Sequence, residues 1–208
     1  MIVAVSGGTS GIGAAIVDEG LRRGWTMLSG SRRTGLDVRD ETSVNAFFSG
    51  PVDAAVACSA VSVDALFVEI TPDAITHVID TNLNGAFLFA RAAIHHGATS
   101  IVFVGSLSQL GAPRNAVYSA SKAGLVGLMR AMTVEYSHVR TNVLVSGFVV
   151  TPMTISLPRR IGRRVRDATP LGRSIRAGEV AQGVADLLVS GLKGRVLRLS
   201  GGLLETPL

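Results

Sequence analysis

The sequence predicts a single α/β domain built on a doubly wound parallel sheet, and three observations support this fold class. Short β-branched or apolar runs alternate along the chain with longer segments of helical spacing. A glycine-rich turn joins the first run to the first helical segment. The 208 residues, 47% of them apolar, are enough for one substantial core, and no repeat or linker marks a second domain. Alternating strand and helix predicts parallel strands covered on both faces.

The strands are predicted from short apolar runs bounded by glycine or polar residues. They are expected at residues 2–5, 25–29, 52–58, 100–104, 141–145 and 196–199, with a very short additional strand at 36–38. Only three residues separate Arg33 from Asp37, whereas a parallel crossover needs a dozen or more. The usual crossover helix therefore does not fit between the second strand and residues 36–38.

The helices are predicted from apolar residues that recur every three or four positions. In the longest stretch, Ile75, Val78, Leu83 and Phe87 follow this spacing. Helices are expected from about residue 14 to 23, and at 71–96, 115–136 and 179–189.

Composition narrows the class of protein. The single cysteine, Cys58, cannot form an internal disulfide. The N-terminal run MIVAVSGG is unlike a signal peptide. No apolar stretch reaches the roughly 20 residues that a membrane helix needs. We therefore expect a cytoplasmic protein without a membrane partner. The net charge of +5 comes from 18 arginines against two lysines, much of it in one segment, so nucleic acid is not the expected partner. The four histidines show no metal-ligand spacing, and no metal is expected.

The segment SGGTSGIG, residues 6–13, lies between the first predicted strand and helix. Its glycines permit a tight turn and close approach of a pyrophosphate, while the helix N-terminus offers free N–H groups to phosphates. This context is typical of a Rossmann-type dinucleotide site rather than of an ordinary glycine turn. The expected contact residues are Gly7, Thr9, Ser10, Gly11, Ile12 and Gly13.

The end of the second strand predicts the choice of nucleotide. An acidic residue there would bind the ribose hydroxyls of NAD, but the sequence reads Ser31-Arg32-Arg33. A small hydroxyl followed by guanidinium groups suits a 2′-phosphate, so NADP(H) is favoured over NAD(H), with a solvated basic loop as the alternative. Asp37 and Val38 follow; the Asp37 carboxylate either contacts the adenine amino group or serves only as a turn residue.

Tyr118 and Lys122 lie one helical turn apart in the segment AVYSASKAGLVG. A phenol with a pKa of about 10 is too weak a base at neutral pH, but a nearby cation favours the phenolate. A phenol tuned in this way can donate a proton to a carbonyl oxygen or accept one from an alcohol. The pair alone is common by chance on helices, so its significance depends on the surrounding motifs.

Together with SGGTSGIG, the segments TNLNG, VFVGSLSQ, YSASKAG and SGFVVTPM make the chain resemble the short-chain dehydrogenase/reductase family over nearly its whole length, as a trimmed member similar to the 3-oxoacyl reductases. The resemblance implies that Tyr118 is the acid/base and that Lys122 lowers its pKa and binds the nicotinamide ribose. It also implies that Ser106 binds the substrate oxygen and Asn82 supports a water in the proton relay. Ser106 precedes Tyr118 by one residue fewer than expected, which leaves Ser108 as a second candidate.

The chain departs from the family pattern at three places. Residues 57–60 read Ala-Cys-Ser-Ala where the family has Asn-Asn-Ala-Gly, Ser146 replaces a proline, and the crossover helix is missing. Gly147, Val149 and Thr151 remain in the segment that the resemblance places beside the nicotinamide. The departures bear on cofactor affinity, so a non-catalytic regulatory member that binds NADP(H) is the alternative to an enzyme.

Residues 157–176 carry seven arginines and one acidic residue, within the segment of about 152–177 where the resemblance implies a substrate-covering element. Such a lid suits an acidic substrate or one bound to an acyl carrier protein; a solvated helix face or an oligomer interface is the alternative. Its apolar residues Ile155, Leu157 and Ile161 suggest that part of the substrate is hydrophobic.

The expected activity is the NADPH-dependent reduction of a small carbonyl compound to an alcohol, or the reverse, by a homotetramer or homodimer. Related epimerases or dehydratases and a nucleic-acid binder are weaker alternatives.

Overall fold

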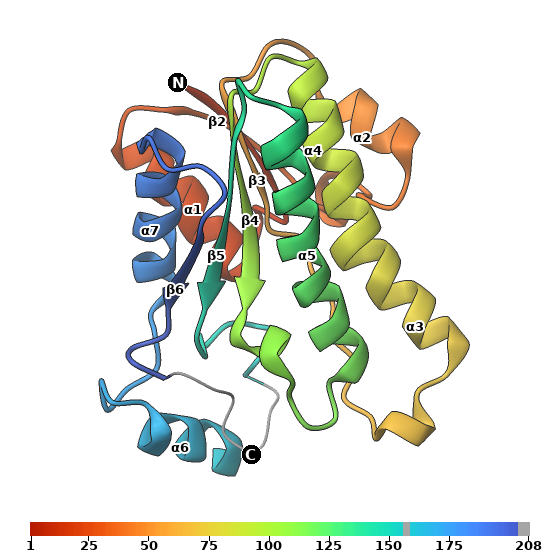
Figure 1. The fold of residues 1–208 in the computed structure, drawn as a ribbon, viewed down its shortest axis with the longest axis vertical. Helices are drawn as coiled ribbons and strands as arrows, with labels where there is room; N and C mark the ends of the chain where they lie inside the picture. The colour runs from red at the N-terminus through yellow and green to blue at the C-terminus, as the bar shows by residue number, and fades with distance from the viewer. Residues whose placement is uncertain (156–158, 204–208) are drawn as a thin grey trace.

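A six-stranded sheet between two layers of helices forms the protein, as described by a computed structural model for residues 1–155 and 159–203 (Figure 1). All strands are parallel, in the order β2-β1-β3-β4-β5-β6. They are β1 (Ile2–Ser6), β2 (Thr26–Gly30), β3 (Ala54–Ala57), β4 (Ser100–Ser106), β5 (Arg140–Ser146) and β6 (Val196–Leu199). The predicted doubly wound α/β class is confirmed.

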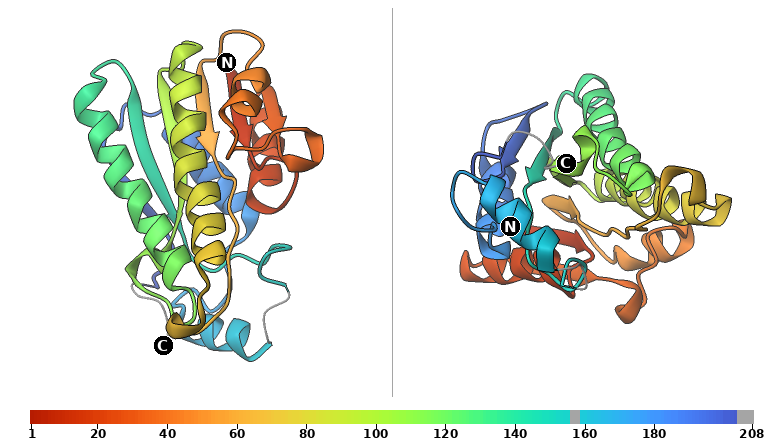
Figure 2. Two further views of the ribbon diagram at one scale, coloured as in Figure 1. Left: turned by 90° about the vertical axis from the view of Figure 1, so that its right-hand side faces the viewer. Right: turned by 90° about the horizontal axis from the view of Figure 1, so that it is seen from below.

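The helices divide between the two faces of the sheet, with α1 and α7 on one and α2, α4 and α5 on the other (Figures 1 and 2). Their bounds are α1 (Gly11–Arg22), α2 (Glu41–Phe47), α3 (Pro72–Ile79), α4 (Gly85–His95), α5 (Ala116–Glu135), α6 (Arg159–Ala168) and α7 (Ala177–Val189). No helix among the described residues is long and apolar enough to cross a membrane. Neither α2 nor α6 was predicted from the sequence.

Each face of the sheet has its own core because successive side chains of a strand point to opposite sides. In β1, Val3 and Val5 pack toward α1 and α7, whereas Ala4 faces the helices of the other layer. Phe89 of α4 and Leu125 of α5 are fully buried in that second core. Packing on both faces therefore fixes the position of the helices on the sheet. It also fixes the directions in which the loops leave the strands.

The strand predicted at residues 36–38 is wrong. The amide of Leu36 donates to Ser31 O at 2.9 Å, and the amide of Asp37 donates to Ser43 Oγ at 2.9 Å. These local bonds use the donors that a strand would offer to β2, while Leu36 and Val38 are buried in the core. Burial of the two apolar side chains thus sets the path of this connection, and β2 stands at the edge of the sheet order. As expected, no α-helix fits between Arg33 and Asp37.

The predicted helix at 71–96 contains an interruption. Between α3 and α4 the backbone forms a π-helical turn over Asp80–Asn84, in which Asn82 is buried. Such turns add one residue to a helical turn and are frequent at functional sites.

Replacing Leu36 by alanine tests whether residues 36–38 are core rather than surface. Leu36 is 3% exposed, so we expect Leu36→Ala to lower the free energy of unfolding by about 2–5 kcal/mol. Leu21, 57% exposed on α1, provides a matched control, and Leu21→Ala is expected to change stability by about 0.5 kcal/mol at most. Urea denaturation of both variants measures the difference; equal losses would contradict the assignment.

Candidate active site

A cavity with a volume of about 300 Å³ lies in the crevice between the carboxyl ends of β1 and β3. From β1 the chain passes first to β2 on one side and then to β3 on the other, so the loops that follow these strands diverge. Ligands of open α/β sheets bind at such switch points. The lining includes the loop after β1, residues 31–33 and the start of α5.

In the glycine turn after β1, the backbone lies very close to the loop after β3 and to the start of α1. Gly7 has a φ of +70°, and a Cβ atom there would lie 2.9 Å from Ser59 Cα; a Cβ atom on Gly13 would lie 2.1 Å from Gly7 O. The first turn of α1 contains no acidic residue, and Ser10 makes no side-chain cap to its N–H groups. This glycine-lined cradle at a helix N-terminus fits a pyrophosphate, and it brings Gly7, Thr9, Ser10, Gly11, Ile12 and Gly13 to the cavity as expected.

Ser31 fixes the basic residues at the far end of the same cavity. Its hydroxyl accepts a hydrogen bond from Thr9 Oγ1 at 2.8 Å and from the amide of Arg33 at 3.3 Å, which caps the short turn at Arg32–Thr34. Arg32 and Arg33 line the cavity and form no ion pair with a described residue. Two guanidinium groups that line the cavity at this position fit an anionic group such as a 2′-phosphate.

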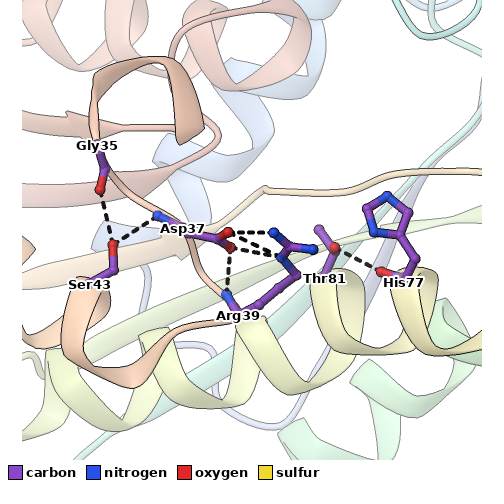
Figure 3. A network of polar contacts seen from close by, with 6 residues as sticks. All are labelled: Gly35, Asp37, Arg39, Ser43, His77 and Thr81. Carbon is purple, nitrogen blue, oxygen red and sulfur yellow. Dashed lines mark hydrogen bonds and ion pairs between the residues drawn. The ribbon is translucent and has the colours of Figure 1, made fainter. Parts of the chain in front are cut away.

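Asp37 and Val38 also line the cavity, but the Asp37 carboxylate is held by a neighbour (Figure 3). Arg39 Nη2 donates to Asp37 Oδ2 at 2.6 Å, and the amide of Arg39 donates to Asp37 Oδ1 at 3.0 Å. These bonds hold the pKa of Asp37 at about 2. The amide contact is that of a turn residue, which was one of the two interpretations of Asp37 left open by the sequence.

Asn82, expected beside the reacting groups, braces a loop. Its Oδ1 accepts from the amide of Val61 at 2.8 Å, and its Nδ2 donates to Val61 O at 2.9 Å and to Ser121 Oγ at 3.0 Å. It is fully buried and contributes to neither of the two cavities described here. The π-helical turn thus joins the loop after β3 to α5.

Tyr118 and Lys122 lie one turn apart at the start of α5, with Lys122 Nζ 5.7 Å from the centre of the Tyr118 ring. Lys122 Nζ donates to Val104 O at 2.8 Å, and burial lowers the pKa of Lys122 to about 8. Burial raises the pKa of Tyr118 to about 12, against a hydrogen bond with Ser106 that lowers it. The expected net lowering of the Tyr118 pKa is therefore not found, because desolvation of the phenolate outweighs the other effects.

A second cavity, of about 220 Å³, adjoins the first at Tyr118. Ser106 and Ser108 both line it, and the amide of Ser108 donates to Ser106 Oγ at 3.2 Å. Tyr118 lines both cavities, as do Ile12, Ser146, Thr151 and Met153. A ligand in the second cavity would thus meet a ligand in the first beside the Tyr118 hydroxyl.

The segment after β5 lines the second cavity and reaches the first at Thr151. Gly147 approaches the backbone of Ser200, where a Cβ atom would lie 2.9 Å from Ser200 Cα, and Val149 is buried. The amide of Thr151 donates to Thr154 Oγ1 at 2.9 Å. The predicted residues Gly147, Val149 and Thr151 all line the second cavity, and Thr151 also lines the first.

The arginine-rich segment, residues 157–176, contains both ion-paired and exposed arginines. Arg173 makes a bidentate ion pair with Glu179 of α7, with both distances 2.8 Å, so its charge is used within the fold. On α6, Arg160, Arg163 and Arg164 are exposed. Leu157 lies outside the described residues, Ile155 is exposed, and Ile161 packs against the core.

Several lining residues were not predicted from the sequence. Val165 of α6 and Leu203 line the second cavity, and Arg39 and Thr81 line the first. The spacing of Ile161 and Val165 marks an apolar stripe on an otherwise basic helix and could have indicated that this side of α6 faces the core. Among the described residues, no group of three or more His, Cys, Asp or Glu side chains could hold a metal ion.

The sequence of this chain is similar to those of known reductases. A family model described as enoyl-(acyl carrier protein) reductase matches residues 27–203. The chain is 31% identical over 226 residues to the 3-oxoacyl-[acyl-carrier-protein] reductase MabA of Mycobacterium avium, covering 97% of this chain and 89% of that protein. It is 34% identical to the 3-oxoacyl-[acyl-carrier-protein] reductase of Homo sapiens, with 97% of each chain covered.

A solved structure described as a small-chain dehydrogenase in complex with NADPH superposes with a TM-score of 0.91 over 98% of each chain. At 23% identity, this likeness bears on the fold alone.

The buried Lys122 predicts a pH-dependent stability. Its pKa falls from 10.5 to about 8 in the folded chain, so between these values the unfolded chain holds a proton that the folded chain has released. The free energy of unfolding therefore rises with pH in this window, and the penalty for the buried cation is complete below it. We expect Lys122→Met to lose this rise, so that its stability relative to the wild type falls by roughly 2 kcal/mol between about pH 7 and pH 10.

Urea denaturation at both pH values measures the change, with Lys193→Met, which removes the chain's other lysine, as the control. Parallel behaviour of wild type and Lys122→Met would contradict a depressed Lys122 pKa.

Proposed function

The chain belongs to the short-chain dehydrogenase/reductase family, and we propose that it uses NADPH to reduce a ketone to a secondary alcohol, or catalyses the reverse. The observation that carries the proposal is the position of Tyr118 where two cavities meet, with the buried Lys122 beneath it and Ser106 within hydrogen-bonding reach. A bound nicotinamide nucleotide would supply the hydride for the carbonyl carbon. The chain's own residues then have to bind, orient and protonate the substrate.

Tyr118 is the proposed proton donor. With its pKa raised by burial to about 12, the phenol is protonated at neutral pH and ready to act as a general acid. Ser106 donates a hydrogen bond to the carbonyl oxygen and orients it. Lys122, a cation through most of the neutral range, favours the phenolate that remains when Tyr118 gives up its proton. Asn82 holds the loop after β3 in place, and Ser108 is the second candidate for the role of Ser106.

NADPH rather than NADH is the proposed cofactor because the chain offers guanidinium groups and no acidic residue directly after β2. Arg32 and Arg33 bind the 2′-phosphate, and Ser31 sets their position. The glycine cradle at α1 binds the pyrophosphate. Thr151, which lines both cavities, borders the nicotinamide end, and Gly147 and Val149 lie next to it in the lining of the second cavity. The substrate enters the second cavity, whose lining includes Val165 from the apolar side of α6.

The proposed substrate class is based on the similar proteins and on the exposed positive charge of α6. Proteins similar to this chain are described as acting on acyl groups carried by acyl carrier protein. We propose a 3-oxoacyl substrate, with residues 152–177 as its cover and the exposed Arg160, Arg163 and Arg164 facing an acidic carrier. We also propose that the chain assembles as a homotetramer or homodimer through α4 and α5, where Phe87 and Val134 are exposed.

Removing both cavity arginines should abolish the cofactor preference. In a fluorescence titration we expect the wild type to bind NADPH much more tightly than NADH. Arg32→Ala/Arg33→Ala should weaken NADPH binding roughly a hundredfold, because two charge-assisted contacts are lost, and leave NADH binding nearly unchanged. Arg195→Ala/Arg198→Ala, which removes the same charge near the opposite edge of the sheet, is the control. A wild type that binds neither nucleotide would refute the proposed function.

Removing the Tyr118 hydroxyl should stop turnover without loss of cofactor. We expect Tyr118→Phe to lower kcat for acetoacetyl-CoA reduction by about a hundredfold or more, since general acid catalysis contributes at least this much. NADPH binding should change by less than about threefold. Tyr136→Phe, which alters the chain's other tyrosine, should keep its activity. If NADPH binds but neither wild type nor Tyr118→Phe turns over, the non-catalytic regulatory alternative is favoured.

A further inference from the structure

Arg114, in the connection between β4 and α5, has a backbone conformation that is costly for its residue type. Its φ is +62°, and among the described residues it is the only one other than glycine with a positive φ. A residue with a Cβ atom is strained in this left-handed region, whereas glycine adopts it freely. Glycine at position 114 would form the same turn without strain, so the side chain is the part of Arg114 that needs an explanation.

Arg114 holds the loop after β3 against the start of α5. Arg114 Nε donates to Asp64 Oδ1 at 2.7 Å, and the amide of Ala65 donates to Arg114 O at 3.0 Å. Beside them, Ser62 Oγ donates to Asn115 Oδ1 at 2.7 Å, and Asn115 directly precedes α5. We call these three contacts, between residues 62–65 and residues 114–115, the latch.

The latch borders the second cavity and not the first. Ser62, Asp64 and Asn115 line the second cavity, which Tyr118 also lines. Within the described part of the chain, the lining of the first cavity includes none of the latch residues. A change in the latch would therefore alter the side of the site proposed for the substrate and leave the side proposed for the nucleotide intact.

Two anchors of unequal strength hold the loop after β3. Val61 makes two hydrogen bonds with the side chain of Asn82, which is fully buried. The Arg114 and Asp64 side chains are 48% and 49% exposed, so water competes for their ion pair. The latch is thus the weaker anchor, and it decides how firmly residues 62–65 are held in the cavity wall.

We propose that Arg114 is a positioning residue that selects the substrate, because it holds residues 62–65 in the wall of the second cavity. The inference rests on the proposed function and goes further, since it assigns substrate selection to a residue outside the groups around Tyr118. Arg114 lines neither cavity and acts through Asp64. Without the latch, residues 62–65 are less often in place, so the cavity binds a small substrate less well and admits a bulky one more readily.

Steady-state kinetics with acetoacetyl-CoA and the bulkier benzoylacetyl-CoA test the proposal. Arg114→Gly keeps the turn but removes the ion pair. It should raise KM for acetoacetyl-CoA about threefold to fivefold and leave kcat and the Kd for NADPH within about twofold. The ratio of kcat/KM for benzoylacetyl-CoA to that for acetoacetyl-CoA should rise. Arg114→Lys, which keeps a cation near Asp64, should lie between Arg114→Gly and the wild type.

A double-mutant cycle and a control separate positioning from other roles. Asp64→Asn should change KM in the same direction as Arg114→Gly, and the double variant should be no worse than Arg114→Gly alone. The control is Glu41→Gln, which breaks the exposed ion pair between Glu41 and Arg91, two residues that line neither cavity. It should leave both substrates unaffected. Thermal unfolding of Arg114→Gly should stay close to that of the wild type, because relief of backbone strain offsets the lost ion pair.

The possible results distinguish the inference from the proposed function. An unchanged KM in Arg114→Gly would overturn the inference and leave the proposed function standing. Loss of stability with an unchanged substrate ratio would overturn it in favour of a purely structural role. A further rise of KM in the double variant would overturn positioning, because Asp64 would then contact the substrate itself. If the wild type binds NADPH but reduces neither substrate, the proposed function fails.

Discussion

Parallel pairing of all six strands is the constraint on which the whole site depends. It sends every loop that follows a strand to one edge of the sheet, and the reversal of strand order between β1 and β3 makes two of these loops diverge. The crevice between them therefore results from the strand order alone and does not depend on which polar residues line it. Residues from the loops after β1 and β3, from β4 and from α5 are far apart in the sequence, and they reach the crevice because their elements end or begin at the same edge.

Buried polar side chains convert this crevice into a fixed geometry. Lys122 is hydrogen-bonded to the carbonyl of Val104 on β4, and Asn82 joins the loop after β3 to α5. Each group would be costly to bury without these partners. The same bonds therefore satisfy buried groups and hold the start of α5 against the sheet.

The sequence was sufficient for the fold class, the glycine cradle and the Tyr118–Lys122 pair, because each depends on local spacing. It was wrong about residues 36–38, where the burial of Leu36 and Val38 outweighs a strand-like composition. The bidentate contact of Arg39 and the π-helical turn at Asn82 were not predictable, since both depend on how segments meet in space. Val165 and Leu203 in the lining of the second cavity were missed for the same reason, because they reach it from distant parts of the chain.

The absence of a strand at residues 36–38 has a consequence for local stability. Within the described residues β2 pairs only with β1, so the part of the cavity that holds Arg32 and Arg33 follows an edge strand. Edge strands open more readily than central ones, and their amides exchange with solvent sooner. A nucleotide that bridges the turn after β1 and residues 31–33 would link this edge to the centre of the sheet. Hydrogen exchange of β2 would then report occupancy of the cavity, because binding and the rigidity of this edge are thermodynamically linked.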